Sequence, residues 1–241
     1  MALIVQKYGG SSVGTIDRIR NVARRLIEVK KEGNKIMAVI SAMSGVTDKL
    51  IGLAHEVMDN PPERELDMLL ATGEQQSIAL LCMAITEMGY KAMSFTGQQA
   101  GVCTYGSHTR GRIHSIEPAR VLKALDDDYI VVCAGFQGVT EDGTIHTLGR
   151  GGSDLSAIAM AAAVNADLCQ IFTDVDGVYD RDPRQYPDAV RFGRISYDKM
   201  LKLIGNGAQV LHDRSVVLAR ERGIPIEVLS AFTGEPGTIV G

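Results

Sequence analysis

Residues 3–41 read LIVQKYGGSSVGTIDRIRNVARRLIEVKKEGNKIMAVIS. The stretch begins with a short apolar run, residues 3–8, which ends at a pair of glycines. Apolar residues then recur at helical spacing over residues 16–31, and a Gly-Asn pair closes that helix. Residues 35–41 form a second apolar run that is typical of a buried strand. This order of strand, helix and strand predicts an α/β protein whose strands are covered by helices.

The same alternation of strand and helix continues along the rest of the chain. Helical patterns extend over residues 48–58 and 62–88, with a break expected at Thr72 and Gly73. An alanine-rich helix at residues 157–164 is expected to pack closely against the sheet. Further strands are expected at residues 92–95, 129–134, 168–173 and 225–229, and a hairpin turn at residues 141–143. We therefore predict a three-layer α/β/α sandwich with a mainly parallel central sheet.

Composition and charge exclude several classes of protein. The 241 residues include 25 basic and 29 acidic side chains, and a net charge of −4 argues against a nucleic-acid-binding surface. No apolar run approaches the roughly 18 residues that a membrane span requires. The N-terminus has no basic lead-in and is too short for a signal-peptide core. We therefore expect a cytoplasmic protein with neither nucleic acid nor a membrane as a partner.

The cysteines and histidines do not have the spacing of metal ligands. The five histidines include no His-x-x-x-His pair. The four cysteines are widely separated, without a Cys-x-x-Cys pair, and stand at positions Cys82, Cys103, Cys133 and Cys169. We therefore expect reduced cytosolic thiols and no structural metal site.

The first glycine-rich loop, residues 7–14, follows the first strand. Ligands of open α/β sheets bind outside the carboxyl ends of the strands, where glycines let the backbone approach and helix amides attract anions. Lys7 adds a charge suited to phosphate. The loop is not a Walker A motif, because Thr15 and Ile16 stand where Lys-Ser/Thr is required. From the residues alone, the loop is either a phosphate-binding loop or a tight turn with a surface lysine.

Two further loops combine glycines with charged residues. In residues 148–154, LGRGGSD, Arg150 stands beside open helix amides, which favours a carboxylate or phosphate ligand. Asp154 occupies the third glycine position of a Rossmann fingerprint, and its alternative role is to complement a helix dipole. Residues 173–184 are dense in acids and arginines but do not form an EF-hand. Spacing does not decide whether they bind a nucleotide or pair with one another.

Residues 41–48 join the second strand to the next helix, and Glu74 stands beside the expected helix break. A glutamate at such a break either lies on the surface or faces a cavity and accepts a hydrogen bond from an amine. From the residues alone, the surface position is favoured.

Together these loops resemble the aspartate kinases of the amino-acid kinase superfamily. The resemblance extends in order along nearly the whole chain. It is carried by VQKYGGSSVG at 5–14, SAMSGVTDKL at 41–50, TGEQQS at 72–77, TLGRGGSDLSA at 147–157, FTDVDGVYDRDPR at 172–184 and GAQVLHDRSV at 207–216. It implies a three-layer kinase domain that transfers the γ-phosphoryl group of ATP, with Mg²⁺, to the side-chain carboxylate of L-aspartate. The product would be 4-phospho-L-aspartate, which leads to lysine, threonine and methionine.

The resemblance also assigns roles to residues. It implies that Lys7 and Asp154 are catalytic, with Asp154 organising Lys7. It implies a nucleotide site formed by Lys7, Gly9, Gly10, Ser41, Thr173, Asp174, Tyr179, Asp182, Arg184 and Gln209. It implies an aspartate site formed by Thr47, Glu74, Arg150, Gly151, Gly152 and Ser153, in which Arg150 grips a carboxylate and Glu74 faces the amino group. No metal ligand is assigned to the protein, and a homodimer is implied by the resemblance alone.

Three departures from the family pattern bear on these expectations. Tyr8 and Ser11 replace phenylalanine and threonine, and Gln209 replaces a lysine that contacts the nucleotide. Family members continue past a segment like residues 235–238 into regulatory ACT domains, so residues 1–241 are expected to form a catalytic domain with those domains absent. The alternatives are a superfamily enzyme with another acceptor, such as glutamate, acetylglutamate, carbamate or UMP, and a catalytically silent ligand-binding subunit. Only Gln209 favours the silent subunit.

Overall fold

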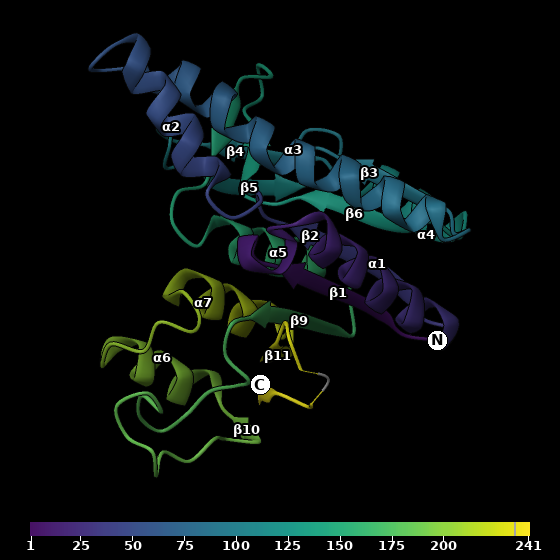
Figure 1. Cartoon of the computed structure of the whole chain (residues 1–241), viewed down its shortest axis with the longest axis vertical. Helices are drawn as coiled ribbons and strands as arrows, with labels where there is room; N and C mark the ends of the chain where they lie inside the picture. The colour runs from purple at the N-terminus through teal and green to yellow at the C-terminus, as the bar shows by residue number, and fades with distance from the viewer. Residues whose placement is uncertain (234) are drawn as a thin grey trace.

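The computed structural model, which describes residues 1–233 and 235–241, is built around an eight-stranded sheet (Figure 1). The strand order is β10-β12-β11-β9-β1-β2-β6-β3. The described pairs are parallel except for β11 with β12. The strands are β1 (Leu3–Tyr8), β2 (Lys35–Ile40), β3 (Ala92–Phe95), β6 (Ile130–Ala134), β9 (Leu168–Thr173), β10 (Arg194–Ile195), β11 (Ile226–Ser230) and β12 (Thr238–Val240). The predicted mainly parallel central sheet is confirmed.

Helices cover both faces of this sheet, as the sequence predicts. The helices are α1 (Ile16–Lys31), α2 (Val46–Val57), α3 (Glu63–Glu87), α4 (Ala119–Asp126), α5 (Gly152–Ala163), α6 (Tyr197–Gly205) and α7 (Asp213–Arg222), with a short 3₁₀ helix η1 (Gly10–Val13). Figure 1 shows α2 and α3 in the upper part of the view and α6 and α7 in the lower part. The helix α1 begins at the expected residue because the Thr15 side chain accepts a hydrogen bond from the amide of Arg18.

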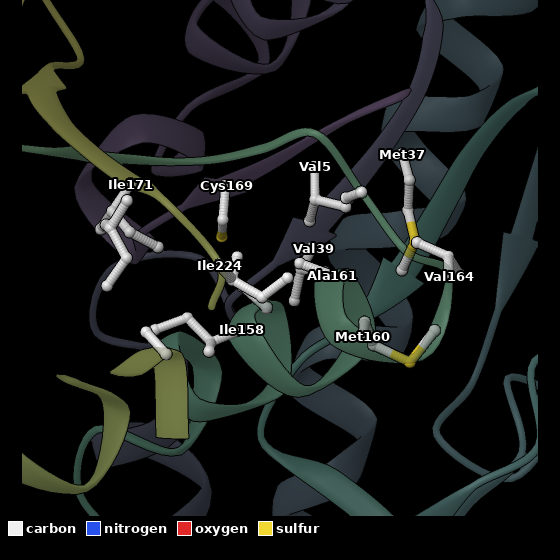
Figure 2. Packing of buried hydrophobic residues seen from close by; sticks show 14 of the residues in the cluster. Val5, Met37, Val39, Ile158, Met160, Ala161, Val164, Cys169, Ile171 and Ile224 are labelled. Carbon is white, nitrogen blue, oxygen red and sulfur yellow. The ribbon is translucent and has the colours of Figure 1, made fainter. Parts of the chain in front are cut away.

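Alternate residues of the central strands pack into two separate cores. Val5, Met37 and Val39 belong to the core on the α5 side, which also contains apolar residues of α4, α6 and α7. Figure 2 shows these three side chains directed toward residues of α5 such as Ile158. Residues of the opposite parity, such as Tyr8, pack with α1 and α3. Because successive side chains of a strand point to opposite faces, the strand residue two positions after Val5 also faces α5.

The long helix α3 differs from its sequence prediction. The break expected at Thr72 and Gly73 is wrong, because the helix continues from Glu63 to Glu87 without interruption. Gly73 meets a packing requirement instead: a Cβ there would lie 2.9 Å from the Cβ of Ala42. The glycine therefore lets the helix approach the loop after β2 rather than ending the helix.

The length of α3 matters for a second expectation from the sequence, that no apolar run is long enough to span a membrane. Among the described residues, one helix, Glu63–Glu87, is long and apolar enough to cross a membrane by length and composition alone. Of its apolar window, 44% is buried inside the protein, and a helix packed into a core meets the same criteria. The helix meets these criteria as a whole, although its sequence contains no uninterrupted apolar run of that length, as expected.

A second, four-stranded sheet with the order β5-β4-β7-β8 was not predicted. Its strands are β4 (Val102–Tyr105), β5 (Arg112–Ile116), β7 (Gln137–Val139) and β8 (Ile145–Thr147). The antiparallel pairing of β7 with β8 confirms the hairpin predicted at residues 141–143. This smaller sheet packs against α3 and leads through β8 into the loop before α5.

Candidate active site

The candidate site lies at the carboxyl ends of three neighbouring strands. The central strand β1 pairs in parallel with β2 on one side and with β9 on the other. The loops after β1, β2 and β9 therefore leave the sheet at the same edge, which is where ligands of open α/β sheets bind. Three of the sequence-predicted loops thus come together.

Lys7 and Asp154 meet at this edge. Lys7, at the end of β1, faces α5, and its Nζ lies 2.6 Å from Oδ1 of Asp154 in the first turn of that helix. The two side chains are only 11% and 12% exposed. Asp154 Oδ1 makes no hydrogen bond of good geometry with a described residue, so the contact is ionic. Desolvating two charges costs free energy that their attraction does not always return, so stability alone is a weak reason for such a pair.

Glycines let the loop after β1 pack against both Lys7 and the loop after β2. A Cβ at Gly9 would lie 3.6 Å from the Nζ of Lys7, so the ammonium group lies beside bare backbone. A Cβ at Gly10 would lie 2.8 Å from the carbonyl oxygen of Ala42, and the Gly10 carbonyl accepts a hydrogen bond from the amide of Ser44. Only a residue without a side chain fits at position 10, so the backbones of the two loops pack directly against each other.

Glu74 is buried in α3 with 3% of its surface exposed, so the surface position favoured by the residues alone is wrong. Its Oε1 accepts a hydrogen bond of 2.9 Å from the amide of Ala42, and its Oε2 has no partner among the described residues. Burial raises the pKa of Glu74 to about 7, against the opposing effect of the Ala42 amide. A buried carboxylate with one free oxygen is suited to accept hydrogen bonds from an ammonium group.

The loop before α5 has its shape fixed by a neighbouring helix. Gly151 has a φ of +70°, and a Cβ there would lie 2.2 Å from the ring of His212. Arg214, on α7, donates hydrogen bonds to the carbonyl oxygens of Leu148 (3.2 Å) and Arg150 (2.8 Å). Sequence reasoning gave no role to His212 or Arg214, although both lie in a string that carried the resemblance.

The residues expected around the substrate are only partly in contact with one another. Ser41, after β2, donates a hydrogen bond of 3.0 Å to the hydroxyl of Ser153. This bond joins the loop after β2 to the start of α5, beside Gly152. Thr47 is half-buried in the first turn of α2. Arg150 is exposed, and its guanidinium has no ion-pair or hydrogen-bond partner among the described residues. It is therefore free to bind an anion.

The loop after β9 pairs largely with itself. Thr173 donates a hydrogen bond of 3.1 Å to Asp174, and both residues lie at the site edge because they end or follow β9. The Tyr179 hydroxyl bonds to Asp176 at 3.0 Å, and burial, followed by this bond, raises the pKa of Tyr179.

Three other residues expected at the nucleotide are not brought to the Lys7–Asp154 pair. The Asp182 carboxylate pairs with Arg184 at 3.1 Å, which lowers the pKa of Asp182. Gln209 is exposed between α6 and α7. In the described part of the chain, no hydrogen bond or ion pair joins these side chains to Lys7 or Asp154.

Replacing Glu74 by glutamine tests its burial. The raised pKa means that Glu74 keeps its proton in the folded protein at pH values where the unfolded side chain has already ionised. The free energy of unfolding of the wild type therefore falls as pH rises from about 4.5 to about 7. At about 1.4 kcal/mol per pKa unit, Glu74→Gln should become more stable than the wild type by roughly 3 kcal/mol across this window, with no further gain at higher pH.

The measurement is urea unfolding of both proteins at several pH values from 4.5 to 8.5. The control is Glu87→Gln, because Glu87 is an exposed glutamate on the same helix and should produce no such pH-dependent difference. A constant difference between Glu74→Gln and wild type over this range would contradict the raised pKa.

Comparisons with known proteins agree with this geometry. The amino acid kinase family profile matches residues 2–230. The aspartokinase of Geobacillus stearothermophilus is 52% identical over 240 residues, which cover 100% of this chain and 59% of that protein. The solved aspartate kinase of Synechocystis has a TM-score of 0.89 and 49% identity, over 99% of this chain and 40% of that one.

A second solved structure, E. coli aspartokinase III in complex with aspartate and ADP, also has a TM-score of 0.89, with 25% identity over 99% of this chain and 64% of that one. The chain spans 57–59% of the length of the curated relatives that it matches. The family profile covers almost all of the described fold, including the strands and loops that form the candidate site. The chain therefore belongs to the amino acid kinase family.

Proposed function

We propose that residues 1–241 form the catalytic domain of an aspartate kinase, which transfers the γ-phosphoryl group of ATP to the side-chain carboxylate of L-aspartate. The observation that carries the proposal is the buried Lys7–Asp154 pair between two glycine-rich loops, with the buried carboxylate of Glu74, on α3, hydrogen-bonded to the loop after β2. The whole-chain identity of about 50% to aspartokinases supports aspartate as the acceptor. The reaction yields 4-phospho-L-aspartate and ADP.

The residues at the edge of the sheet fit a triphosphate. Gly9 and Gly10 leave this part of the first loop without side chains, and the backbone at Gly9 lies beside the Lys7 ammonium group. Lys7 supplies a positive charge beside it. Lys7, Gly9, Gly10 and Ser41 would therefore hold the phosphates, with Thr173 and Asp174 nearer the rest of the nucleotide. Mg²⁺ would enter with ATP, because it keeps few protein ligands at such sites, and it would neutralise phosphate charge.

The residues on the other side of the site fit a small amino acid with two carboxylates. Arg150 offers a free guanidinium, which matches a carboxylate through two parallel hydrogen bonds. Glu74 offers the unpartnered Oε2 to the ammonium group of aspartate. Thr47 and the backbone of Gly151–Ser153 are the remaining groups that we assign to the aspartate site. An ammonium beside Glu74 would favour the ionised carboxylate and so offset the cost of its burial.

This arrangement needs no strong general base. The acceptor carboxylate is already an anion, so the barrier comes from bringing two anions together. Lys7 stabilises negative charge on the phosphoryl group in flight, and Asp154 holds the Lys7 ammonium in place. The amides at the start of α5 and the Arg150 guanidinium orient the acceptor. Charge neutralisation and alignment therefore supply the catalysis.

Trapping the acyl phosphate tests the proposal. The chain is incubated with Mg²⁺, ATP and hydroxylamine, and hydroxamate and ADP are both measured with L-aspartate, L-glutamate or N-acetyl-L-glutamate as the acceptor. With UMP as the acceptor only ADP is measured, because its product is not an acyl phosphate. We expect hydroxamate with aspartate only, and ADP formed in equal amount. ATP binding without ADP formation in the presence of any of the acceptors would contradict the proposal and favour a silent ligand-binding subunit. ADP formation with another acceptor would reassign the substrate.

A further inference from the structure

A second cluster of polar side chains lies between α3 and the smaller sheet. Asp67 is on α3, His108 is in the loop between β4 and β5, and His146 is on β8. One carboxylate oxygen and one ring nitrogen from each histidine all lie within 4.8 Å of one another. The proposed kinase reaction uses none of these three residues.

The two oxygens of Asp67 have different surroundings. Asp67 is fully buried, and its Oδ1 accepts hydrogen bonds from the Thr147 hydroxyl at 2.6 Å and the Thr109 amide at 3.0 Å. Its Oδ2 faces the Nδ1 of His108 at 2.8 Å and also accepts from the Thr109 amide at 3.0 Å. Among the described residues, neither a lysine nor an arginine pairs with this buried carboxylate. Its charge is balanced only by these hydrogen bonds and by His108, which is a cation only when it is protonated.

The two histidines offer nitrogens on the Oδ2 side. Their rings lie with centroids 4.6 Å apart and nearly perpendicular. His146 is only 4% exposed, and its Nδ1 has no hydrogen-bond partner among the described residues. Such a buried, unpartnered nitrogen needs an explanation. The His108 side chain is 27% exposed, so the cluster is open to solvent on one side.

We propose that Asp67, His108 and His146 bind a divalent transition-metal ion of the zinc class. Two imidazoles and a carboxylate are ligands that such ions prefer over Mg²⁺. Bonds from zinc to these ligands are about 2.0–2.2 Å long, so ligand atoms within 4.8 Å of one another need to move by about an ångström or less. Three protein ligands and a solvent-facing position on the His108 side make up a four-coordinate site.

The hydrogen bonds already present would support the ion. With Oδ2 as the ligand, Oδ1 keeps the Thr147 hydroxyl and the Thr109 amide, which hold the carboxylate in place as outer partners of metal ligands do. Where Nδ1 of His108 is the ligand, the ion replaces the proton that lies between Nδ1 and Oδ2: a neutral ring then carries its proton on Nε2, and an imidazolium releases one proton to solvent.

Spacing along the chain could not indicate this site. Asp67 and His108 are 41 residues apart, and the three ligands come from a helix, a loop and a strand. The expectation of no metal site rested on the absence of closely spaced histidines, which detects only sites built on one element.

Cobalt titration of the metal-free chain, without nucleotide, tests the proposal. We expect Co²⁺ to produce visible absorption that saturates at one equivalent and is abolished by one equivalent of Zn²⁺, whereas excess Mg²⁺ leaves it unchanged. Zn²⁺ should also raise the melting temperature. Absence of saturable Co²⁺ absorption from the wild type would overturn the proposal and leave the cluster as a hydrogen-bonded brace.

Two ligand variants and one control complete the test. Loss of an outer partner of a metal ligand costs about 10–100-fold in affinity, so His146→Gln and His108→Asn should each weaken Co²⁺ binding by about a hundredfold or more. His108→Asn can keep a donor to Asp67, so it decides the question if His146→Gln does not fold by circular dichroism. His114→Gln, which changes an exposed histidine of β5, should bind as the wild type does. Wild-type affinity in a folded ligand variant would overturn the proposal.

Discussion

Lys7→Ala is expected to lower kcat by about 10²–10³-fold, the effect of removing one preorganised group that stabilises transition-state charge, while the KM for aspartate changes by only a few-fold. The reason is position: Lys7 lies at the end of β1, beside Gly9, with its ammonium 2.6 Å from Asp154. In the proposed reaction, its charge would matter most when the phosphoryl group is between donor and acceptor. Steady-state kinetics with each substrate varied in turn separates kcat from the two KM values.

The variant also leaves Asp154 buried without its partner, and breaking a buried pair can cost about 3–5 kcal/mol of stability. Circular dichroism and thermal melting must therefore accompany the kinetics. Lys35→Ala is the matched control, because Lys35 stands at the opposite end of the neighbouring strand β2 and pairs with Asp126 near the surface. Its turnover should be that of the wild type. Near-normal turnover in a folded Lys7→Ala protein would remove Lys7 from the mechanism.

Strands and helices whose own apolar pattern matches their burial could be predicted from the sequence. The strands β1 and β9 have the predicted bounds because both faces of a central parallel strand are buried, which makes each strand a short apolar run. The helix α1 has the predicted bounds because its apolar residues recur at helical spacing after a capping Thr15. Apart from the hairpin turn between β7 and β8, the smaller sheet was not predicted, because its strands are three to five residues long and β5 is largely polar and exposed.

Gly73 shows why local signals can mislead. A glycine inside a helical pattern usually weakens the helix, so the sequence predicted a break. In the fold, the missing side chain lets α3 approach Ala42, which in turn brings the adjacent Glu74 within hydrogen-bond distance of the Ala42 amide. The same glycine therefore explains both errors, the predicted break and the predicted surface position of Glu74. Neither could be corrected without knowing which loop packs against the helix.

The candidate site was predictable in outline rather than in contact detail. The rule that ligands bind at the carboxyl ends of strands identified the loops after β1, β2 and β9. The pairing of Lys7 with Asp154 joins residues far apart in the sequence, so only the resemblance indicated it. The hydrogen bonds from Arg214 to Leu148 and Arg150 depend on how α7 packs beside the loop before α5, which no local pattern reveals.

Arg150→Lys is expected to raise the KM for aspartate by roughly ten- to a hundredfold. Lysine keeps the charge but cannot make the two parallel hydrogen bonds with which a guanidinium binds a carboxylate. A charge-assisted hydrogen bond contributes about 1.5–3 kcal/mol, and about 1.4 kcal/mol is a factor of ten. Because Arg214 binds backbone carbonyls of this loop, including that of Arg150 itself, the loop should keep its shape when the Arg150 side chain changes.

Two saturation curves, one for each substrate, on wild type and Arg150→Lys give the measurement. The KM for ATP should change much less than that for aspartate, because Lys7 and the first glycine loop, not the Arg150 loop, are assigned to the phosphates. Arg64→Lys, an exposed arginine at the start of α3, is the control and should leave both curves unchanged. An increase in the KM for ATP without one for aspartate would mean that Arg150 binds phosphate, and the two glycine loops would then have to exchange their ligands.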